Sequence, residues 1–430
     1  MIDHEDPLIA DSLWTATANP PPAAPPLQGA EDTAVAIVGG GITGLSAALH
    51  LRQRGIAATV IEAQSIGWGA SGRNGGQLNP GLKSDPDTIE ATFGAEMGKR
   101  MIAATGGGAD YTMQLIREHD IACDAVQPGW IVAAHNPVTL AATRERARQW
   151  AARGADVQPL SRDQIGAMVG ADVYTGGLID RRGANLHPLN YTYGLAEAAL
   201  RHGAVLHGAS PVTTLARQGA GYVLTTPTGT LRAGKVLICT NGYTDGLVPP
   251  LARTLVPVRS IQVATEPLSG AMRRTILPER QAVSDSRRVM VYYKLDGAGR
   301  LLMGGRGDYD RHTTAALLEN LRRVTRKMYP QLQGIRFEHA WGGFVAMTAD
   351  HYPHLTTLGP GVLSATGYNG RGVALATVMG RIMADWADGV PPEALDFPMT
   401  PAQPIPFHFL RKPAVKAAIC LFRLQDALGI

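Results

Sequence analysis

A glycine-rich turn between an apolar run and a helix sets the architecture that this chain can adopt. The apolar run, residues 34–38, leads into "GGGITG" at 39–44, which matches G-x-G-x-x-G. Helical spacing then continues to Arg54, and a second apolar run ends in Glu62. This order of strand, glycine turn, helix and strand is typical of a dinucleotide-binding β-α-β unit.

The residues of the turn have separate physical roles in such a unit. Gly39 allows the sharp turn from strand to helix, Gly41 lets backbone N–H groups approach a pyrophosphate, and Gly44 lets the helix pack closely on the sheet. The carboxylate of Glu62 can accept hydrogen bonds from both hydroxyls of an adenosine ribose. The motif leaves NAD and FAD open, and a glycine-rich turn with a surface glutamate is the alternative without a ligand.

A second glycine-rich stretch, "GWGASGRNGGQ" at 67–77, begins shortly after Glu62. Glycines give up side-chain contacts and add chain entropy, so we expect another group to approach the backbone closely there. Arg73 and Asn74 offer donors to phosphates and to the edge of a flavin ring. The stretch therefore favours FAD over NAD, and a flexible surface loop is the other interpretation.

The stretch "GYNGRGVALATVMGRIMADW", which begins at Gly367, has a similar pattern near the C-terminus. Gly367, Gly370 and Gly372 lie between a predicted strand and a predicted helix. Free N–H groups at the start of that helix would stabilise the negative charge of a reduced flavin. An ordinary strand–helix turn explains this segment equally well.

The rest of the pattern predicts an α/β fold, α+β overall, in which a discontinuous, Rossmann-like FAD-binding domain carries an inserted antiparallel-sheet substrate domain. Within the insertion, "VMVYYKL" and "RLLMGG" form a predicted hairpin. The predicted ranges are 1–30 for an extended, proline-rich lead-in on the surface, 31–96, 176–256 and 335–395 for the FAD-binding domain, 97–175 and 257–334 for the substrate domain, and 396–430 for a C-terminal tail and helix.

Composition argues against several other classes of protein. A formal net charge of +4 over 430 residues is too small for a nucleic-acid surface. Cys123, Cys239 and Cys420 share no metal or redox spacing, which predicts no metal site and fits a reducing, cytoplasmic location. Residues 34–51 are nearly uncharged, but their glycines indicate a strand and a turn rather than a membrane span.

With these motifs in view, the chain resembles the D-amino-acid-oxidase-like family of FAD-dependent amine and amino-acid oxidoreductases. Within that family it is most similar to the branch of bacterial γ-glutamylputrescine oxidases and L-pipecolate-type oxidases. The segments that carry the resemblance are "SLWTATA", "VAIVGGGITGLSAALHL", "GWGASGRNGGQ", "LHPLNYTYGLAEAALRHGAVLH", "VLICTNGYTD", "LLMGGR", "WGGFVAMTADHYP" and "GYNGRGV". The combination is specific for the family and the cofactor, and much less so for the substrate.

The resemblance implies where FAD is held. Val212 would meet the adenine through its backbone, residues 240–242 would close over the cofactor, and residues 367–372 would cap its pyrimidine edge. Relatives often have histidine where this chain has Arg371, so the flavin potential or the preferred substrate charge is expected to differ. Residues 344–348 contain no cysteine, so noncovalent FAD is expected. The implied cofactor-binding residues are Gly39, Gly41, Ile42, Thr43, Gly44, Glu62, Ala63, Gly69, Ala70, Ser71, Arg73, Asn74, Gly75, Gly76, Gln77, Val212, Thr240, Asn241, Gly242, Gly367, Tyr368, Asn369, Gly370, Arg371 and Gly372.

Candidate substrate residues come from the inserted layer. Tyr292 and Lys294 should share one face of a strand, with Tyr293 on the other, and would offer an aromatic wall and a cation to an alkylamine that carries a carboxylate. Arg306 could pair such a carboxylate bidentately, and Arg371 is a further candidate that faces the substrate or the flavin. Ordinary strand packing of the tyrosines and a surface ion pair of Arg306 are the competing interpretations.

These features predict FAD-dependent oxidation of a small-molecule secondary amine or N-substituted amino compound, either γ-glutamylputrescine-like or a cyclic or N-alkyl amino acid. Hydride transfer to flavin N5 would give an imine that hydrolyses, with no general base required, and oxygen or another acceptor would reoxidise the flavin. An NAD-linked dehydrogenase, and a flavin-binding subunit or sensor without amine chemistry, are the alternatives.

The basic, amphipathic C-terminal helix packs across the domain boundary in the preferred interpretation and rests on a membrane in the other.

Overall fold

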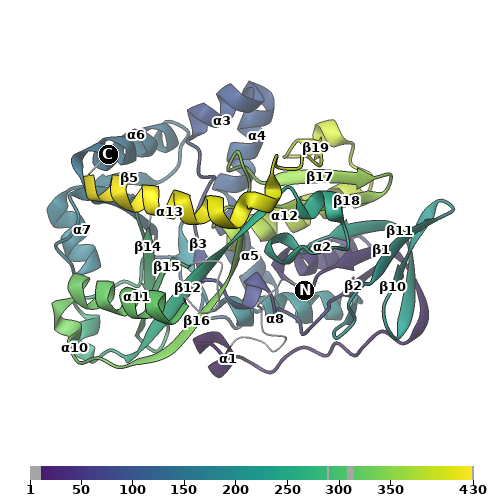
Figure 1. The fold of residues 1–430 in the computed structure, drawn as a ribbon, viewed down its shortest axis with the longest axis horizontal. Coiled ribbons are helices and arrows are strands. Elements are labelled where there is room, and N and C mark those ends of the chain that lie inside the picture. The colour runs from purple at the N-terminus through teal and green to yellow at the C-terminus, as the bar shows by residue number, and fades with distance from the viewer. Residues whose placement is uncertain (1–10, 288–289, 308–313, 429–430) are drawn as a thin grey trace.

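Two large sheets stand side by side in the computed structural model, each covered by its own helices (Figure 1). The structure describes residues 11–287, 290–307 and 314–428. The first ten residues of the predicted lead-in and the last two of the predicted tail lie outside this part. In the described part, no helix combines the length and apolar character that crossing a membrane demands.

The first sheet has nine strands among the described residues, and its central path runs β19-β17-β18-β11-β1-β2-β8. Strand β1 is parallel to both β11 and β2, and β2 is parallel to β8. The turn at 39–44 therefore follows a strand buried between two parallel neighbours, as the sequence predicts. The strands are β1 Gly29–Val38, β2 Ala58–Ile61, β8 Val205–His207, β9 Thr214–Gln218, β10 Gly221–Thr225, β11 Gly229–Ile238, β17 His354–Gly359, β18 Val362–Thr366 and β19 Met399–Pro401.

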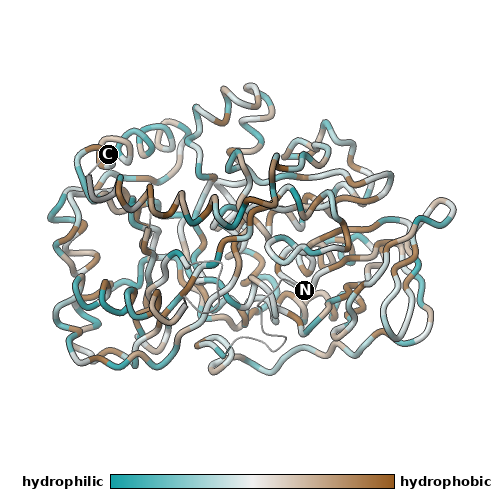
Figure 2. Tube along the Cα trace, viewed as in Figure 1, coloured by the Kyte–Doolittle hydropathy of each residue, from teal (hydrophilic) through white to brown (hydrophobic). Residues whose placement is uncertain are grey.

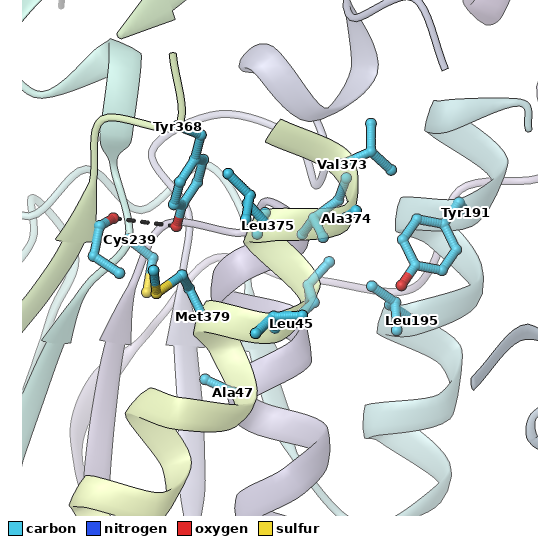
Figure 3. Packing of buried hydrophobic residues seen from close by; sticks show 14 of the residues in the cluster. Leu45, Ala47, Tyr191, Leu195, Cys239, Tyr368, Val373, Ala374, Leu375 and Met379 are labelled. Atoms are coloured by element: carbon cyan, nitrogen blue, oxygen red, sulfur yellow. Dashed lines mark hydrogen bonds between the residues drawn. The ribbon is translucent and has the colours of Figure 1, made fainter. Parts of the chain in front are cut away.

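Three helices form the core on one face of this sheet, namely α2 (Ile42–Gln53), α8 (Pro188–Arg201) and α12 (Gly372–Ala387). Figure 3 shows α2 packed between the other two, with Leu45, Leu195 and Met379 at their contacts. Helices α2 and α12 cross closely, because a Cβ added at Gly380 would lie 2.5 Å from the Cβ of Ser46. Residues 42–51 are accordingly buried on all sides, and the start of α2 is held firmly above the sheet.

In the part of the chain that the structure describes, the second sheet has eight strands in the order β16-β12-β15-β14-β13-β4-β6-β5. Neighbours are antiparallel except β13 and β4, which are parallel. The predicted hairpin is confirmed, since β14 pairs with β15 with Tyr292 opposite Gly304. The strands are β4 Trp130–Ala134, β5 Val157–Leu160, β6 Gly176–Asp180, β12 Val256–Pro267, β13 Ala282–Asp285, β14 Val291–Leu295, β15 Arg300–Arg306 and β16 Phe337–Met347.

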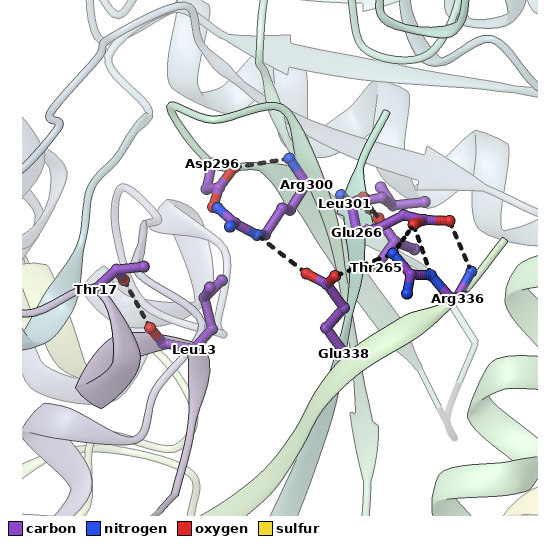
Figure 4. Close-up of polar contacts among 9 residues, drawn as sticks. All are labelled: Leu13, Thr17, Thr265, Glu266, Asp296, Arg300, Leu301, Arg336 and Glu338. Carbon is purple, nitrogen blue, oxygen red and sulfur yellow. Dashed lines mark hydrogen bonds and ion pairs between the residues drawn. The ribbon is translucent and has the colours of Figure 1, made fainter. Parts of the chain in front are cut away.

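Ion pairs link residues at the neighbouring ends of β12, β15 and β16 in the second sheet (Figure 4). Arg336 bonds Glu266 at 2.7 Å, and Arg300 bonds Asp296 at 3.3 Å. The pairing of β12 shifts register after Ala264. There the hydroxyl of Thr265 accepts the N–H of Leu301 at 3.0 Å, which occupies a donor at the β-bulge.

Two strands belong to a different sheet from the one that the predicted ranges suggest. Strands β6 and β16 fall within 176–256 and 335–395, ranges expected for the FAD-binding domain, yet both pair within the second sheet. Short apolar strands look alike in sequence, and their sheet is decided by distant partners. The domain boundaries themselves stay a prediction.

The lead-in differs from the expected surface segment. Helix α1 (Leu13–Ala16) buries both Leu13 and Trp14, whereas the proline-rich part after it is extended up to β1. The other elements are α3 Pro86–Phe93, α4 Ala95–Gly106, α5 Gly108–Glu118, α6 Pro137–Ala151, α7 Arg162–Val169, α9 Pro249–Ala252, α10 Gly270–Arg273, α11 Thr314–Met328, α13 Arg411–Leu428, β3 Gln77–Leu78 and β7 Ala184–Asn185.

Candidate functional site

One cavity of about 560 Å³ extends from the carboxyl end of β2 to the strands β12, β14 and β15. Such a volume is ordinary for a cofactor or ligand site. Most of the residues expected from the sequence line this cavity. Those that do not line it are Gly44, Gly76, Gly242, Gly367 and Lys294.

The residues that the cavity does bring together are drawn from segments that are widely separated along the chain. They are Gly39, Gly41, Ile42, Thr43, Glu62, Ala63, Gly69, Ala70, Ser71, Arg73, Asn74, Gly75, Gln77, Val212, Thr240, Asn241, Tyr292, Arg306, Tyr368, Asn369, Gly370, Arg371 and Gly372.

The turn after β1 needs glycine for two measurable reasons. Gly39 has φ +114, and a Cβ there would lie 2.9 Å from the carbonyl oxygen of Cys239. A Cβ at Gly44 would lie 2.1 Å from the carbonyl oxygen of Gly39, so only glycine lets α2 start so close to the sheet. Gly44 thus acts through packing and does not itself face the cavity.

Glu62 ends β2 at the edge of the cavity. Its carboxylate accepts the N–H of Gly40 at 2.7 Å and that of Gln64 at 2.9 Å. Burial raises the pKa of Glu62, while these backbone donors oppose the rise. The carboxylate is therefore fixed in direction at the edge of the cavity.

Two helix N-termini open into the same cavity. Neither Gly41 at the start of α2 nor Arg371 at the start of α12 supplies a side-chain cap to its own helix. The hydroxyl of Ser71 instead accepts the N–H of Ile42 at 3.0 Å. Two helix starts that face one elongated cavity suit an anionic ligand with one charge centre at each, as a dinucleotide with a redox-active ring has.

The loop 67–77 is rigid rather than flexible, because its polar groups are bonded internally. The amide of Asn74 donates to the carbonyl of Ser71 and accepts the N–H of Gly76, both at 2.8 Å. Arg73 Nε donates to the carbonyl of Trp68 at 2.8 Å. The sequence predicts that Asn74 offers a donor to the ligand. In the structure, its side-chain amide bonds within the loop instead.

Side chains from distant elements bond to the backbone of this loop, and the sequence alone did not connect these elements with it. The carbonyl of Arg73 accepts the side-chain N–H groups of Gln262 at 2.7 Å and Trp341 at 3.0 Å. The carbonyl of Asn74 accepts Trp14 Nε1 at 2.8 Å. Trp14 lies edge-on to Trp341, with ring centroids 5.8 Å apart. The one signal in the sequence was the tryptophan of the "SLWTATA" segment.

The loop after β18 is joined to the loop after β11. The side-chain oxygen of Asn241 accepts the N–H of Gly367 at 3.0 Å, and Asn369 accepts the N–H of Thr348 at 3.0 Å. Tyr368 bonds the hydroxyl of Thr43 at 2.7 Å. These bonds fix the start of α12 relative to that of α2.

Tyr292 and Lys294 both point toward the glycine loop, as strand alternation predicts, but only Tyr292 reaches the cavity. The Tyr292 ring fits against Gly75, where an added Cβ would lie 2.8 Å from it, and its hydroxyl bonds Ser260 at 2.6 Å. Burial raises the pKa of Tyr292 to about 12. The phenol therefore stays neutral and forms a wall rather than a base.

Lys294 corrects the expectation of a substrate-facing cation on this strand. Its ammonium donates to the carbonyl of Leu186 and lies 5.2 Å from the centre of the Trp14 ring. Gly76 separates it from the cavity, because a Cβ at Gly76 would lie 2.8 Å from Nζ. Burial lowers the pKa of Lys294 to about 7. Lys294 lies two residues beyond Tyr292 along β14, and its side chain does not line the cavity.

Four cations line the cavity near the second sheet, Lys83, Arg259, Arg306 and Arg371, and the first two were missed in the sequence. Arg371 donates to the carbonyl of Pro80 at 2.7 Å and stacks on Trp130 at 4.8 Å. Arg306, at the end of β15, lines the same region. Lys83 lines this region with an exposed side chain; desolvation by the nearby protein first, then Arg371 and Arg306, lower its pKa to about 8.

Comparisons with known proteins agree with this geometry. A family model described as FAD dependent oxidoreductase, DAO, matches residues 34–386. Gamma-glutamylputrescine oxidoreductase of Escherichia coli is 32% identical over 399 residues, which cover 92% of this chain and 93% of that protein. A probable oxidoreductase, OrdL, of Rhizobium meliloti is 33% identical over 380 residues, which cover 88% of each.

Solved structures give the same fold. Glycine oxidase from Geobacillus kaustophilus matches with a TM-score of 0.71 at 22% identity, over 83% of this chain and 95% of that one. The predicted fold class, Rossmann-like with an antiparallel second sheet, is confirmed by this likeness and by the observed strand pairing.

Proposed function

This chain belongs to the DAO family of FAD-dependent oxidoreductases, and from that premise we propose that it oxidises an N-substituted amino compound that carries a carboxylate. Candidate substrates are a γ-glutamylputrescine-like compound and a cyclic or N-alkyl amino acid. Family membership also makes FAD the cofactor, which removes the NAD-linked alternative.

The observation that carries the proposal is the charge at the substrate end of the cavity. Lys83, Arg306 and Arg371 all line it there. The carboxylates among the described lining residues are those of Glu62, at the end of β2, and Asp245, in the segment after β11. Neither comes from the second sheet. A site with this balance favours an anionic group on the substrate and disfavours a bare diamine.

The same cations help the chemistry of the amine. When bound, FAD accepts the equivalent of a hydride from the carbon next to the amine nitrogen. That transfer needs the neutral amine, and nearby positive charge lowers the pKa of a bound ammonium group. Lys83 and the two arginines would thus bind the carboxylate and favour loss of the proton from the amine at the other end.

Tyr292 would complete the site as an apolar wall. Its ring lies under Gly75, and Gly304 lies against the ring, because a Cβ at Gly304 would be 2.1 Å from it. With a pKa of about 12 the phenol holds its proton throughout the physiological range. Neither it nor any described carboxylate of the second sheet lines the site as a base, which agrees with hydride transfer from a neutral amine.

Anaerobic mixing with matched substrate pairs tests the proposal. Each pair differs only in its carboxylate: an N-methyl amino acid against its amide, and γ-glutamylputrescine against the same compound with its α-carboxylate converted to an amide. We expect the carboxylate member to bleach the visible absorbance of the flavin at least tenfold faster at equal concentration. Equal rates for the two members would contradict the substrate class, and an absence of bleaching with every amine would favour a flavin-binding sensor or subunit.

The Arg306→Met variant locates the effect. We expect a higher KM for the carboxylate substrate and an unchanged KM for its amide, because methionine keeps the length of the stem and removes the charge. Arg232→Met is the matched control, since Arg232 pairs with Asp32 on the surface and lies outside the cavity.

A further inference from the structure

The segment 405–428 exposes an unusual share of apolar side chains. Eight large apolar residues are exposed among the described residues, and five of them lie here. Phe407 and Phe409 are 73% and 74% exposed, and Leu421 and Leu424 are 52% and 57% exposed. The fifth is Leu410. A concentration of this kind indicates a surface that is covered in use.

Helix α13 is attached to the body by few contacts. His408 Nε2 bonds the carbonyl of Leu255 at 2.7 Å, and Arg306 lies 5.8 Å from the Phe422 ring centre. Residues Val415, Ile419 and Phe422 form its inner face and are only half-buried. Of the side chains described in this helix, none is fully buried. Figure 1 shows α13 extended along the outside of the molecule.

The outer face of α13 has two parallel stripes. Ala417, Leu421 and Leu424 follow one another at helical spacing and are exposed, which makes one apolar stripe. Lys412 and Lys416 are one turn apart, exposed, and lie beside that stripe. Figure 2 shows the mixture of apolar and polar positions along the helix.

Phe407 and Phe409 extend the apolar stripe beyond the start of the helix. Their rings are 6.4 Å apart, and Phe407 has φ +52. A bulky side chain rarely adopts this conformation without a reason. Here it turns the phenylalanine toward solvent, next to the first turn of α13.

From this arrangement we propose that α13 and the turn before it dock on an anionic phospholipid surface. The apolar stripe would enter the interface and the basic stripe would contact the headgroups. Charge selects this occupant over a second copy of the chain, because residues 404–430 contain four Lys or Arg and one Asp. Two such faces would repel each other. The proposal is independent of the substrate.

Binding of the full-length holoenzyme to vesicles tests the proposal. Vesicles of phosphatidylcholine with 30% phosphatidylglycerol are compared with vesicles of phosphatidylcholine alone by co-flotation. We expect binding to the anionic vesicles only, and a loss of binding when salt is raised to about 0.5 M. Equal binding to both lipids, or binding to neither, overturns the proposal.

Cys420 gives a direct readout. It is exposed, whereas Cys123 and Cys239 are buried, so a thiol-reactive, environment-sensitive dye attaches to α13 in the natural chain. We expect its emission to shift to the blue with anionic vesicles and to be quenched by spin-labelled lipids. An unshifted emission together with a dimer in light scattering would assign this face to a second copy instead.

Two double variants separate the contribution of charge to vesicle binding from the contribution of apolar contact. Lys412→Gln with Lys416→Gln should weaken vesicle binding by roughly 30-fold, from about a fivefold effect of each charge. Leu421→Ser with Leu424→Ser should abolish the blue shift. The control is Val138→Ser with Val205→Ser, which removes exposed apolar groups elsewhere and should change nothing. Flavin content and thermal melting verify that each variant is folded; equal binding by all three overturns the proposal.

Discussion

Lys83 is the cation whose charge changes near neutral pH at the proposed substrate end of the cavity. It lies near Arg371 and Arg306, and desolvation with their repulsion lowers its pKa to about 8. Below that pH the ammonium is present and can attract a substrate carboxylate; above it the charge is lost. The two arginines keep their charge over this range, so Lys83 supplies the part of the attraction that varies with pH.

The corresponding prediction concerns KM. For a carboxylate substrate, we expect KM to rise as pH increases through about 8. In Lys83→Met we expect KM to be raised by roughly tenfold already at pH 7, the effect of about 1.4 kcal/mol, and to stay flat through pH 8. Steady-state kinetics between pH 6.5 and 9.5 measure both. Lys99→Met, which changes an exposed lysine on α4, is the control. A KM for Lys83→Met that still rises near pH 8 would contradict the role of Lys83.

At the scale of elements, helix α1 acts as a buttress for the glycine loop. Trp14 Nε1 reaches the carbonyl of Asn74 at 2.8 Å across 60 residues of sequence. In Trp14→Phe the ring stays and the donor is lost, which leaves a part-buried carbonyl without this bond at a cost of about 1–2 kcal/mol. Since the loop lines the cofactor cavity, we expect FAD affinity to fall by about tenfold while the fold persists.

Flavin fluorescence on titration into the apoprotein measures that loss. Trp386→Phe is the matched control, because Trp386 lies near Lys235 at the end of α12 that is away from the cavity. If Trp14→Phe binds FAD as tightly as the natural chain does, α1 has no such role.

Helix α8 carries a second testable feature, a histidine that caps it. His187 Nδ1 accepts the N–H of Asn190 at 3.1 Å, and Nε2 lies 3.1 Å from the hydroxyl of Thr17. Burial, followed by repulsion from Lys294, lowers the pKa of His187 to about 4. An unfolded histidine titrates near 6.5. The unfolded state therefore takes up the proton first, and the free energy of unfolding falls as pH decreases from about 6.5 to 4.

The variant His187→Asn removes this titration and keeps a residue that caps helices well. We expect it to be less stable than the natural chain at pH 7, because it loses the contacts with Thr17 and Trp14. The difference in the free energy of unfolding between the variant and the natural chain should narrow by up to about 3 kcal/mol when the pH is lowered to 4. Chemical denaturation at several pH values measures this, with His202→Asn as the control; a constant difference would refute the assignment.

Across the whole molecule, the sequence predicts what is local and misses what is distant. The turn at 39–44, the loop at 67–77 and the hairpin of β14 with β15 are recognisable because their glycines and alternation are contiguous. Trp14 and Lys83 are not, since each acts on a segment far from it along the chain. The same reason explains β6 and β16, which pair with β4 and β12, each more than 40 residues away along the chain.

Lys294 shows a subtler limit. Alternation along β14 correctly places it on the same face as Tyr292. How far that face extends along the cavity depends on Gly76 and the carbonyl of Leu186, which come from two other segments. A period of two residues fixes the side of a sheet and leaves the position along it undetermined.

The cavity joins both sheets, so the cofactor should act as a structural element of the whole chain. A ligand that binds only the folded state stabilises it, by about 4 kcal/mol when present at 1,000 times its dissociation constant. Removing FAD with acid and salt should therefore lower the melting temperature by at least several degrees, and adding FAD should restore it. Scanning calorimetry with and without FAD measures the change. An apoprotein that melts at the temperature of the holoenzyme would show that the cavity is not held together in this way.

Acid precipitation of the holoenzyme tests whether FAD is bound covalently or noncovalently. Cys239 is the cysteine among the described cavity-lining residues, and it lies beside Gly39 at the turn. Burial raises the pKa of its thiol well above the usual range, which suppresses the reactive thiolate. We therefore expect all the flavin to leave with the supernatant when the protein is precipitated with acid. A yellow pellet would mean a covalent bond, and mass spectrometry of its flavin-bearing peptide would then identify the residue that forms it.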